Sequence, residues 1–135
     1  MPRRPNDHLA ERVLLPFSSA ALTADATTKL WTVPAGRSAR VASVWMNAPA
    51  AALAVDDTNY AIYKITDGTN IAASWSTKTT GGNGPIVQDT PVLMVLAADA
   101  NVVIAGGEVV SLFIDEFGTV VSIPAVVGII ELLLL

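Results

Sequence analysis

The chain has 135 residues, a length that fits one domain. Charged residues make up only 15% of it and hydrophobic residues 52%, against a usual charged share of about 25%. So few charges leave apolar surface on a lone small domain, which indicates burial against other subunits. The chain has no cysteine, which excludes disulfides and thiolate zinc sites and is typical of a reducing cytosol.

The net charge of −4 is distributed unevenly along the chain. All eight basic residues lie between Arg3 and Lys78, and only acidic residues follow. This asymmetry either lets a basic edge of one subunit meet an acidic edge of the next, or arises by chance in a chain with few charges. No cluster of Lys and Arg with interleaved aromatics is present, which argues against nucleic acid as a partner.

Residues 1–20 are predicted to form an irregular N-terminal arm, ahead of a single domain at residues 21–135. The first eight residues, MPRRPNDH, are polar and are followed by no sustained apolar core of the signal-peptide type. Residues 9–15 have mild helical potential. The arm contains Arg3 and Arg4, a pair too small for a polyanion-binding segment.

The first two strands are predicted at residues 27–33 and 38–46, where the sequence has extended, strand-like patterning. The turn signal Pro-Ala-Gly at residues 34–36 separates them. Strict alternation in the second strand places Val41 and Trp45 on the same face. Neither face of that strand is cleanly polar.

Residues 48–56 are rich in alanine and fit either a short helix or a long loop. Beyond them, residues 59–66 and 71–78 have the clearest hairpin pattern in the chain. The sequence DGTN at residues 67–70 joins them, and Asp-Gly readily supplies the positive φ angles of a tight turn. Residues 79–85 contain three glycines and a proline and are predicted to be a loop.

Four further strand-like segments follow, at residues 91–96, 101–104, 108–117 and from 119 to the C-terminus. About eight short strands with frequent turn signals and no 3.6-residue periodicity predict an all-β sandwich or barrel. No internal repeat of fixed period is present, which disfavours propellers and solenoids.

The chain ends on GIIELLLL, residues 128–135. A membrane-spanning helix needs about 20 apolar residues. The apolar stretch at residues 125–135 is shorter and is interrupted by Gly128 and Glu131. We therefore expect no membrane partner.

As a strand, this ending would have two apolar faces, whereas a surface strand of a lone sandwich has one polar face. Alternation turns Ile130, Leu132 and Leu134 to one face, and Ile129, Leu133 and Leu135 to the other. An exposed edge of this kind would promote aggregation. We predict that the first set lies in the core and that Ile129, Leu133 and Leu135 contact a sister subunit.

Groups suited to catalysis or metal binding are scarce. His8 is the single histidine and lies in the arm, where a catalytic base would lack rigid positioning. Adjacent acids at Asp56-Asp57 and Asp115-Glu116 would point to opposite faces of a strand and are interpreted as solvated loop acids. We predict a non-enzymatic protein with no metal and no cofactor.

Trp31, Trp45 and Trp75 all lie in strand-like runs. One hypothesis places two of them in the core and one at an edge or interface. The other makes them a sugar-stacking platform.

Two runs carry a resemblance to a known family, LWTVPAGRSARVASV at residues 30–44 and VIAGGEVVSL at residues 103–112. They resemble small β-sandwich virion proteins of tailed bacteriophages. In those proteins a Val-Pro-Ala-Gly turn joins two early strands, and an Ala-Gly-Gly/Asp-Glu turn opens a late one. The resemblance covers most of the chain from about Lys29 onward and is strongest to capsid decoration (cement) proteins.

The resemblance implies a single antiparallel, jelly-roll-like β-sandwich that forms homotrimers. It implies a virion protein, made in the host cytoplasm, that binds the major capsid protein on the outer surface of the head and stabilises the shell by bridging capsomers. Arg3, Arg4 and His8 of the arm would contact the capsid. The alternatives are a tail, collar or fibre-attachment subunit and a carbohydrate-binding module; the absence of fibrous repeats or heptads counts against a fibre.

Overall fold

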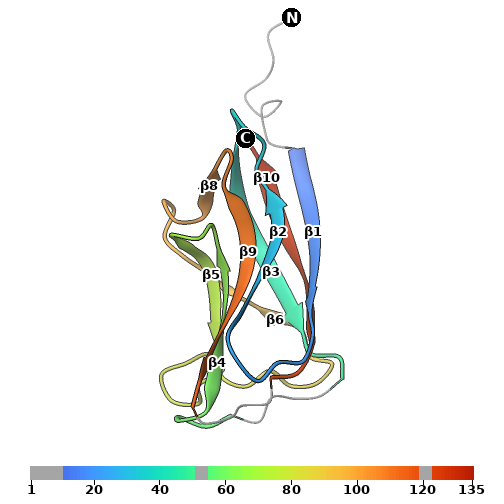
Figure 1. Ribbon diagram of the computed structural model, residues 1–135, viewed down its shortest axis with the longest axis vertical. Coiled ribbons are helices and arrows are strands. Elements are labelled where there is room, and N and C mark those ends of the chain that lie inside the picture. The colour runs from blue at the N-terminus through green and yellow to red at the C-terminus, as the bar shows by residue number, and fades with distance from the viewer. Residues whose placement is uncertain (1–10, 51–54, 119–122) are drawn as a thin grey trace, which may run out of the picture.

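The computed structural model describes residues 11–50, 55–118 and 123–135. These ranges contain ten strands and no helix, hence no helix long and apolar enough to cross a membrane (Figure 1). The strands are β1 (Glu11–Ser19), β2 (Ala26–Thr32), β3 (Ser38–Asn47), β4 (Tyr60–Thr66), β5 (Ile71–Ser76), β6 (Val92–Leu93), β7 (Val95–Leu96), β8 (Val103–Ala105), β9 (Val109–Phe117) and β10 (Val126–Leu134).

The strands form two antiparallel sheets that pack face to face (Figure 1). The first sheet has the order β1-β10-β3-β6, with β8 also paired to β3, and the second has the order β2-β9-β4-β5-β7. The first strand therefore pairs with the last, and the second with the last but one. The orders β1-β10-β3-β6 and β2-β9-β4-β5 form a jelly roll, to which β8 and β7 are added, so the predicted jelly-roll-like sandwich is confirmed and a closed barrel is excluded.

The core lies between the two sheets, because alternate side chains of each strand point inward. Its largest fully buried members are Met46, Tyr63, Ile65, Ile86, Met94, Ile104, Leu112, Ile114, Ile123, Ile130 and Leu132. The Tyr63 hydroxyl is buried with no hydrogen-bond partner among the described residues, and burial raises the pKa of this phenol well above its ordinary value.

A β-bulge in β3 overturns the predicted alternation of that strand. Ser43 pairs with Glu131 and Val41 with Leu132, so Ala42 is an extra residue. After the bulge the inward positions shift by one. Trp45 therefore faces solvent, on the opposite side from Val41. The strict alternation predicted for this strand is wrong here, because a bulge reverses which face the later residues occupy.

The N-terminal segment also differs from its prediction. Residues 11–19, expected to belong to an irregular arm with some helical potential, form β1 and pair with β10 over the full length of both strands. Long-range pairing overrides weak local propensity here, because Leu15 and Phe17 gain burial on the inner face. Residues 1–10 and 51–54 lie outside the described part of the chain, and no helix occurs in the rest of residues 48–56.

The turns were predicted correctly from local chemistry. Residues 67–70 close the β4–β5 hairpin, with the Asp67 N–H donating to the Asn70 carbonyl at 3.2 Å and Gly68 at a φ of 97°. The glycine-rich segment at residues 79–85 contains no strand.

The two runs that carry the family resemblance meet in space. The Gly107 N–H donates to the Val33 carbonyl at 2.8 Å, and the Val33 N–H donates to the Glu108 carbonyl at 2.9 Å. A Cβ at Gly106 would lie 2.8 Å from the Pro34 carbonyl oxygen and 2.6 Å from that of Arg37. The two turns thus form one tightly packed corner, in which glycine at position 106 is a packing requirement.

β10 lies at the centre of the first sheet, between β1 and β3. Gly128 on this strand leaves room for the Phe17 ring, which occupies the space that a side chain at position 128 would need. A Cβ there would overlap both that ring and the Trp45 carbonyl oxygen. Close contact of three strands therefore depends on a residue without a side chain.

We expect Gly128→Ala to lower the free energy of unfolding by about 1–3 kcal/mol, the usual cost of inserting a methyl group into a packed core. The measurement is the urea unfolding midpoint followed by circular dichroism. Adding Phe17→Leu should recover part of the loss in the double variant, because the overlapping ring is removed. An unchanged midpoint for Gly128→Ala would show that the three strands do not need a glycine at this position.

Candidate functional site on the outward sheet faces

The alternation predicted for the C-terminal strand is confirmed. Its inward set, Ile130, Leu132 and Leu134, is buried. Of its outward set, Ile129 is 37% exposed, Leu133 is half-buried and Leu135 is exposed. Contact of the outward set with a sister subunit stays a prediction. Arg3, Arg4 and His8 lie outside the described residues.

An apolar row crosses the outer face of the first sheet. Strand register places Pro16, Ile129, Trp45 and Leu93 side by side on β1, β10, β3 and β6. Trp45 is 44% exposed and Leu93 is 47% exposed. With the neighbouring exposed side chains, these residues form what we call the outer patch: Leu14, Pro16, Trp45, Leu93, Val127 and Ile129.

A shallow cavity of about 250 Å³ opens within the outer patch, between Trp45, Val127 and Ile129. Asn47 also lines it. The Asn47 Oδ1 atom is buried without a hydrogen-bond partner among the described residues. The side chains that line the cavity are otherwise apolar or aromatic.

Charged side chains surround the other end of β10. Arg12 forms an ion pair with Glu131 at 3.0 Å, and Arg40 forms one with Asp99 at 3.0 Å. Leu133 pairs in register with both arginines. We call these four residues, Arg12, Glu131, Arg40 and Asp99, the charged rim. The structure thus places Ile129 in the apolar centre of the sheet face and Leu133 in the charged rim.

Arg37 holds the last residues of the chain in the same rim. Its Nε donates to the main-chain oxygen of Leu135 at 3.2 Å, and its Nη2 donates to that of Leu134 at 3.3 Å. Its Nη1 lies 3.4 Å from the Glu11 carboxylate. The start of β1 and the end of β10 are therefore tied to one guanidinium in the turn after β2.

The three tryptophans form no shared platform, and two of them lie against the core as the first hypothesis predicted, while a place of the third at an interface stays a prediction. Trp31 and Trp75 pack against the core, and the Trp75 Nε1 donates to the Gly84 carbonyl at 3.0 Å. Trp45 is the exposed one. The sequence alone did not reveal its position, because the bulge at Ala42 changes its face.

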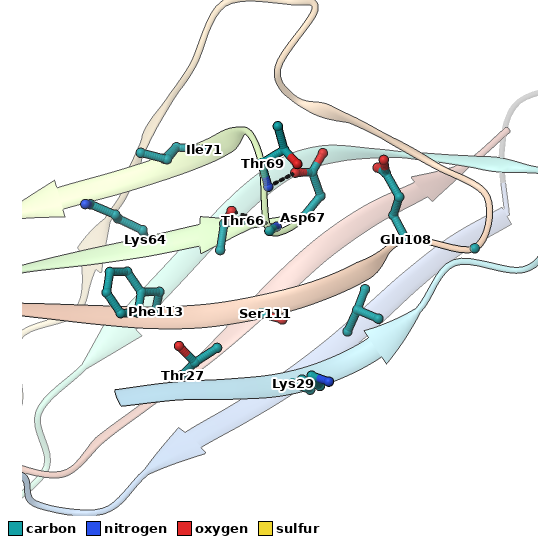
Figure 2. Close-up of a pocket in the computed structure, with 13 residues that line it drawn as sticks. Thr27, Lys29, Lys64, Thr66, Asp67, Thr69, Ile71, Glu108, Ser111 and Phe113 are labelled. Carbon is teal, nitrogen blue, oxygen red and sulfur yellow. Dashed lines mark hydrogen bonds between the residues drawn. The ribbon is translucent and has the colours of Figure 1, made fainter. Parts of the chain in front are cut away.

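The outer face of the second sheet is different, being hollowed and polar. A hollow of about 670 Å³ lies over β2, β9 and β4 and beneath the β4–β5 turn (Figure 2). We call it the sheet hollow; its lining side chains are those of Thr27, Lys29, Lys64, Thr66, Asp67, Thr69, Ile71, Glu108, Val109, Ser111 and Phe113. No sequence signal points to it, because its residues come from distant segments and form no motif.

Hydrogen bonds hold the charged groups of the sheet hollow in place. Lys64 Nζ lies 2.9 Å from the Asp115 carboxylate and 5.4 Å from the centre of the Phe113 ring. Asp67 Oδ1 accepts the N–H groups of Thr69 at 2.8 Å and of Asn70 at 2.7 Å (Figure 2).

Partial burial raises the pKa of Asp67, but the hydrogen bonds from the Asn70 and Thr69 N–H groups together outweigh it, and the net pKa is lowered. Side-chain hydrogen bonds with Glu108 and Asn70 act in the same direction as those backbone bonds. The carboxylate form is thus favoured in the folded hairpin turn.

The acidic doublets bind backbone groups or a neighbouring lysine. Asp56 Oδ1 accepts the Asn59 N–H at 2.6 Å, and Asp57 Oδ1 accepts the Thr80 N–H at 2.6 Å. Hydrogen bonds from these backbone N–H groups lower the pKa of both carboxyls. No group of three or more potential metal ligands gathers within the described ranges.

Comparisons with known proteins identify no family. No family model matches the chain, and no curated protein matches it. Two solved structures are similar to it, both of infectious bursal disease virus. The Gt strain structure matches at 15% identity and a TM-score of 0.38 over 99% of this chain and 36% of that chain. The Gx strain structure matches at 11% identity and a TM-score of 0.29 over 93% and 36% respectively. The chain therefore spans about a third of the length of those chains.

We expect Asp67→Asn to reduce the acid sensitivity of folding. Because the folded pKa is lowered, the stability supplied by the Asp67 carboxylate is fully present above its ordinary value of 3.8 and is lost as pH falls through the lowered value. The contribution should be below about 1 kcal/mol, since this turn is solvent-screened. Urea midpoints at pH 7 and pH 2.5 measure it.

The matched control is Asp89→Asn, because the Asp89 carboxylate accepts no hydrogen bond from the described residues. This control should lose as much stability on acidification as the unmodified chain. If Asp67→Asn also lost as much stability on acidification as the unmodified chain, the Asp67 carboxylate would not couple folding to pH.

Proposed function

We propose that the protein is a non-enzymatic structural component of a virion and acts as a homo-oligomer. The outer patch is the observation that carries the oligomer. It places Trp45, Leu93 and Ile129 side by side on a sheet face that a lone sandwich would cover with polar residues. A sister subunit would remove this apolar surface from water.

The charged rim supports the same proposal. Specific interfaces combine an apolar centre with a polar rim, and here the rim carries the Arg12–Glu131 and Arg40–Asp99 pairs. A stable interface buries about 800 Å² per partner, which is a larger area than the six partly exposed side chains of the outer patch supply. The interface would therefore also include the charged rim. We propose a trimer as the assembly, and this number of subunits rests on the family resemblance alone.

The virion assignment rests on the resemblance of residues 30–44 and 103–112 to phage virion proteins. In this chain those runs form one packed corner around Gly106, which makes them a structural unit rather than two separate turns. Jelly rolls occur in viral capsid proteins, lectins and cupins, so the fold agrees with the assignment without selecting it.

In the finer form of the proposal, the protein is a capsid decoration protein on the outer surface of the head. It is made in the host cytoplasm and binds the major capsid protein, bridging neighbouring capsomers. The N-terminal residues, with Arg3, Arg4 and His8, lie over the shell. A tail, collar or fibre-attachment subunit is the nearest alternative. The position of the labelled protein on intact particles, on the head or on the tail, distinguishes this alternative from a decoration protein.

The alternative of sugar binding on a tryptophan platform requires an exposed tryptophan, and Trp45 meets that condition. Its surroundings do not favour sugar, however. Ile129, Leu93 and Val127 adjoin it, and among the described residues that line the cavity beside it Asn47 alone carries a side-chain amide. A sugar needs several hydrogen-bonding groups, so this surface fits an apolar protein partner better.

We expect Ile129→Glu to dissociate the oligomer, because a carboxylate at the centre of the buried patch would be desolvated without a partner. Light scattering should give a mass that is a multiple of 14.1 kDa for the unmodified chain and 14.1 kDa for the variant. The matched control is Ile71→Glu on the other sheet, an isoleucine with a similar exposure of 39%. The control should keep the mass of the assembly.

Either of two results would contradict the proposed interface. One is an unmodified chain that is monomeric at all concentrations tested. The other is an Ile129→Glu variant that folds, by circular dichroism, and keeps the full mass.

We expect removal of residues 1–10 to weaken binding to undecorated phage heads in a co-sedimentation assay. The control replaces residues 1–10 by a Gly/Ser segment of equal length, which tests whether the arm's own side chains make the contact. Both changes should reduce the bound fraction. Unchanged binding by either form would refute the role of the arm, and no binding by the full-length chain would refute the decoration proposal.

A further inference from the structure

The sheet hollow has the size and position of a ligand site, and the proposed assembly does not use it. Its volume of about 670 Å³ falls within the usual range of small-molecule sites, about 300–1,000 Å³. It lies on the β2-β9-β4 face, whereas the outer patch lies on the other sheet. Figure 2 shows its labelled side chains on this sheet face and at the turn that carries Asp67 and Thr69.

Charges of both signs line the sheet hollow. Lys29 and Lys64 line it together with the carboxylates of Asp67 and Glu108, and Lys64 also forms an ion pair with Asp115 next to the lining. A strongly anionic ligand would face both carboxylates, and a strongly cationic one would face both lysines. The lining therefore favours a neutral ligand that donates and accepts hydrogen bonds.

The remaining lining groups narrow the ligand class. Hydroxyls of Thr27, Thr69 and Ser111 act as both donors and acceptors. Phe113 and Ile71 add apolar surface at the same end as Lys64 (Figure 2). A ring that carries many hydroxyls on its rim and C–H groups on its faces matches this mixture. We propose that the sheet hollow binds a neutral sugar residue of a glycan.

The polar groups are already positioned, which lowers the entropic cost of binding. Two backbone N–H groups hold Asp67 Oδ1 and so fix the orientation of its carboxylate. Glu108 Oε2 accepts the Ala105 N–H at 3.1 Å, which orients that carboxylate in the same way. Lys29 forms no ion pair with any described residue, so its N–H groups are available to donate to the sugar.

The test titrates the ¹⁵N-labelled full-length chain with glucose, galactose, mannose and N-acetylglucosamine, and separately with inorganic phosphate, and follows amide chemical shifts. At least one sugar should shift residues of the sheet hollow with a dissociation constant in the millimolar range. Lys29→Met and Ser111→Ala should each weaken that binding about three- to tenfold, the loss of one hydrogen bond.

Control variants outside the lining locate the binding. Thr28→Val changes the residue that precedes Lys29 on β2. Thr28 pairs in register with the buried Leu112, so this variant should bind the sugar as the unmodified chain does. Trp45→Ala removes the exposed tryptophan of the other sheet and should leave the binding unchanged. Ile129→Glu should also keep it, so failure of the proposed oligomer and failure of this site are distinguishable.

Four results would overturn the proposal. They are the absence of shifts with every sugar, shifts confined to the Trp45 face, equal binding by folded Lys29→Met and Ser111→Ala variants, and stronger binding of inorganic phosphate than of any sugar. The last would identify the hollow as an anion site. Dispersed amide spectra establish that each variant is folded.

Discussion

Pairing of β10 with β1 on one side and β3 on the other is the constraint on which the first sheet depends. It joins the two ends of the described chain, so the contacts that close this sheet are long-range and must overcome a large loop-closure entropy. Gly128 allows the close approach of the three strands, and Ile130 and Leu132 supply the buried inner surface. The same pairing lines up Pro16, Ile129 and Trp45 on the outer face.

The two outward faces of the sandwich differ because their strands carry different residues at the solvent positions. The first sheet presents an apolar centre with charged groups at one end, suited to another protein surface. The second presents hydroxyls and charges of both signs around a hollow, suited to a polar ligand. Pro16 lies on the edge strand β1 and lacks the N–H that an added strand would need, which favours association through faces over strand addition at that edge.

Much of the fold followed from local sequence patterns. The DGTN hairpin turn at residues 67–70 and the glycine-rich loop at 79–85 depend on backbone preferences of a few adjacent residues, and both were predicted correctly. The strand character of β1 was missed, because its weak local pattern is decided by pairing with β10, more than 100 residues away. Interface contacts of Leu133 and Leu135 remain predictions.

The sequence by itself determined the all-β class, the turns and the two-sided character of the C-terminal strand, since each follows from periodicity within a short window. Only the tertiary structure decided that Trp45 faces solvent, because the bulge at Ala42 becomes visible only through pairing with β10. It alone brought Lys29, Asp67 and Ser111 around one hollow. Strand register sets which distant side chains share a face, and register is a property of the folded sheet.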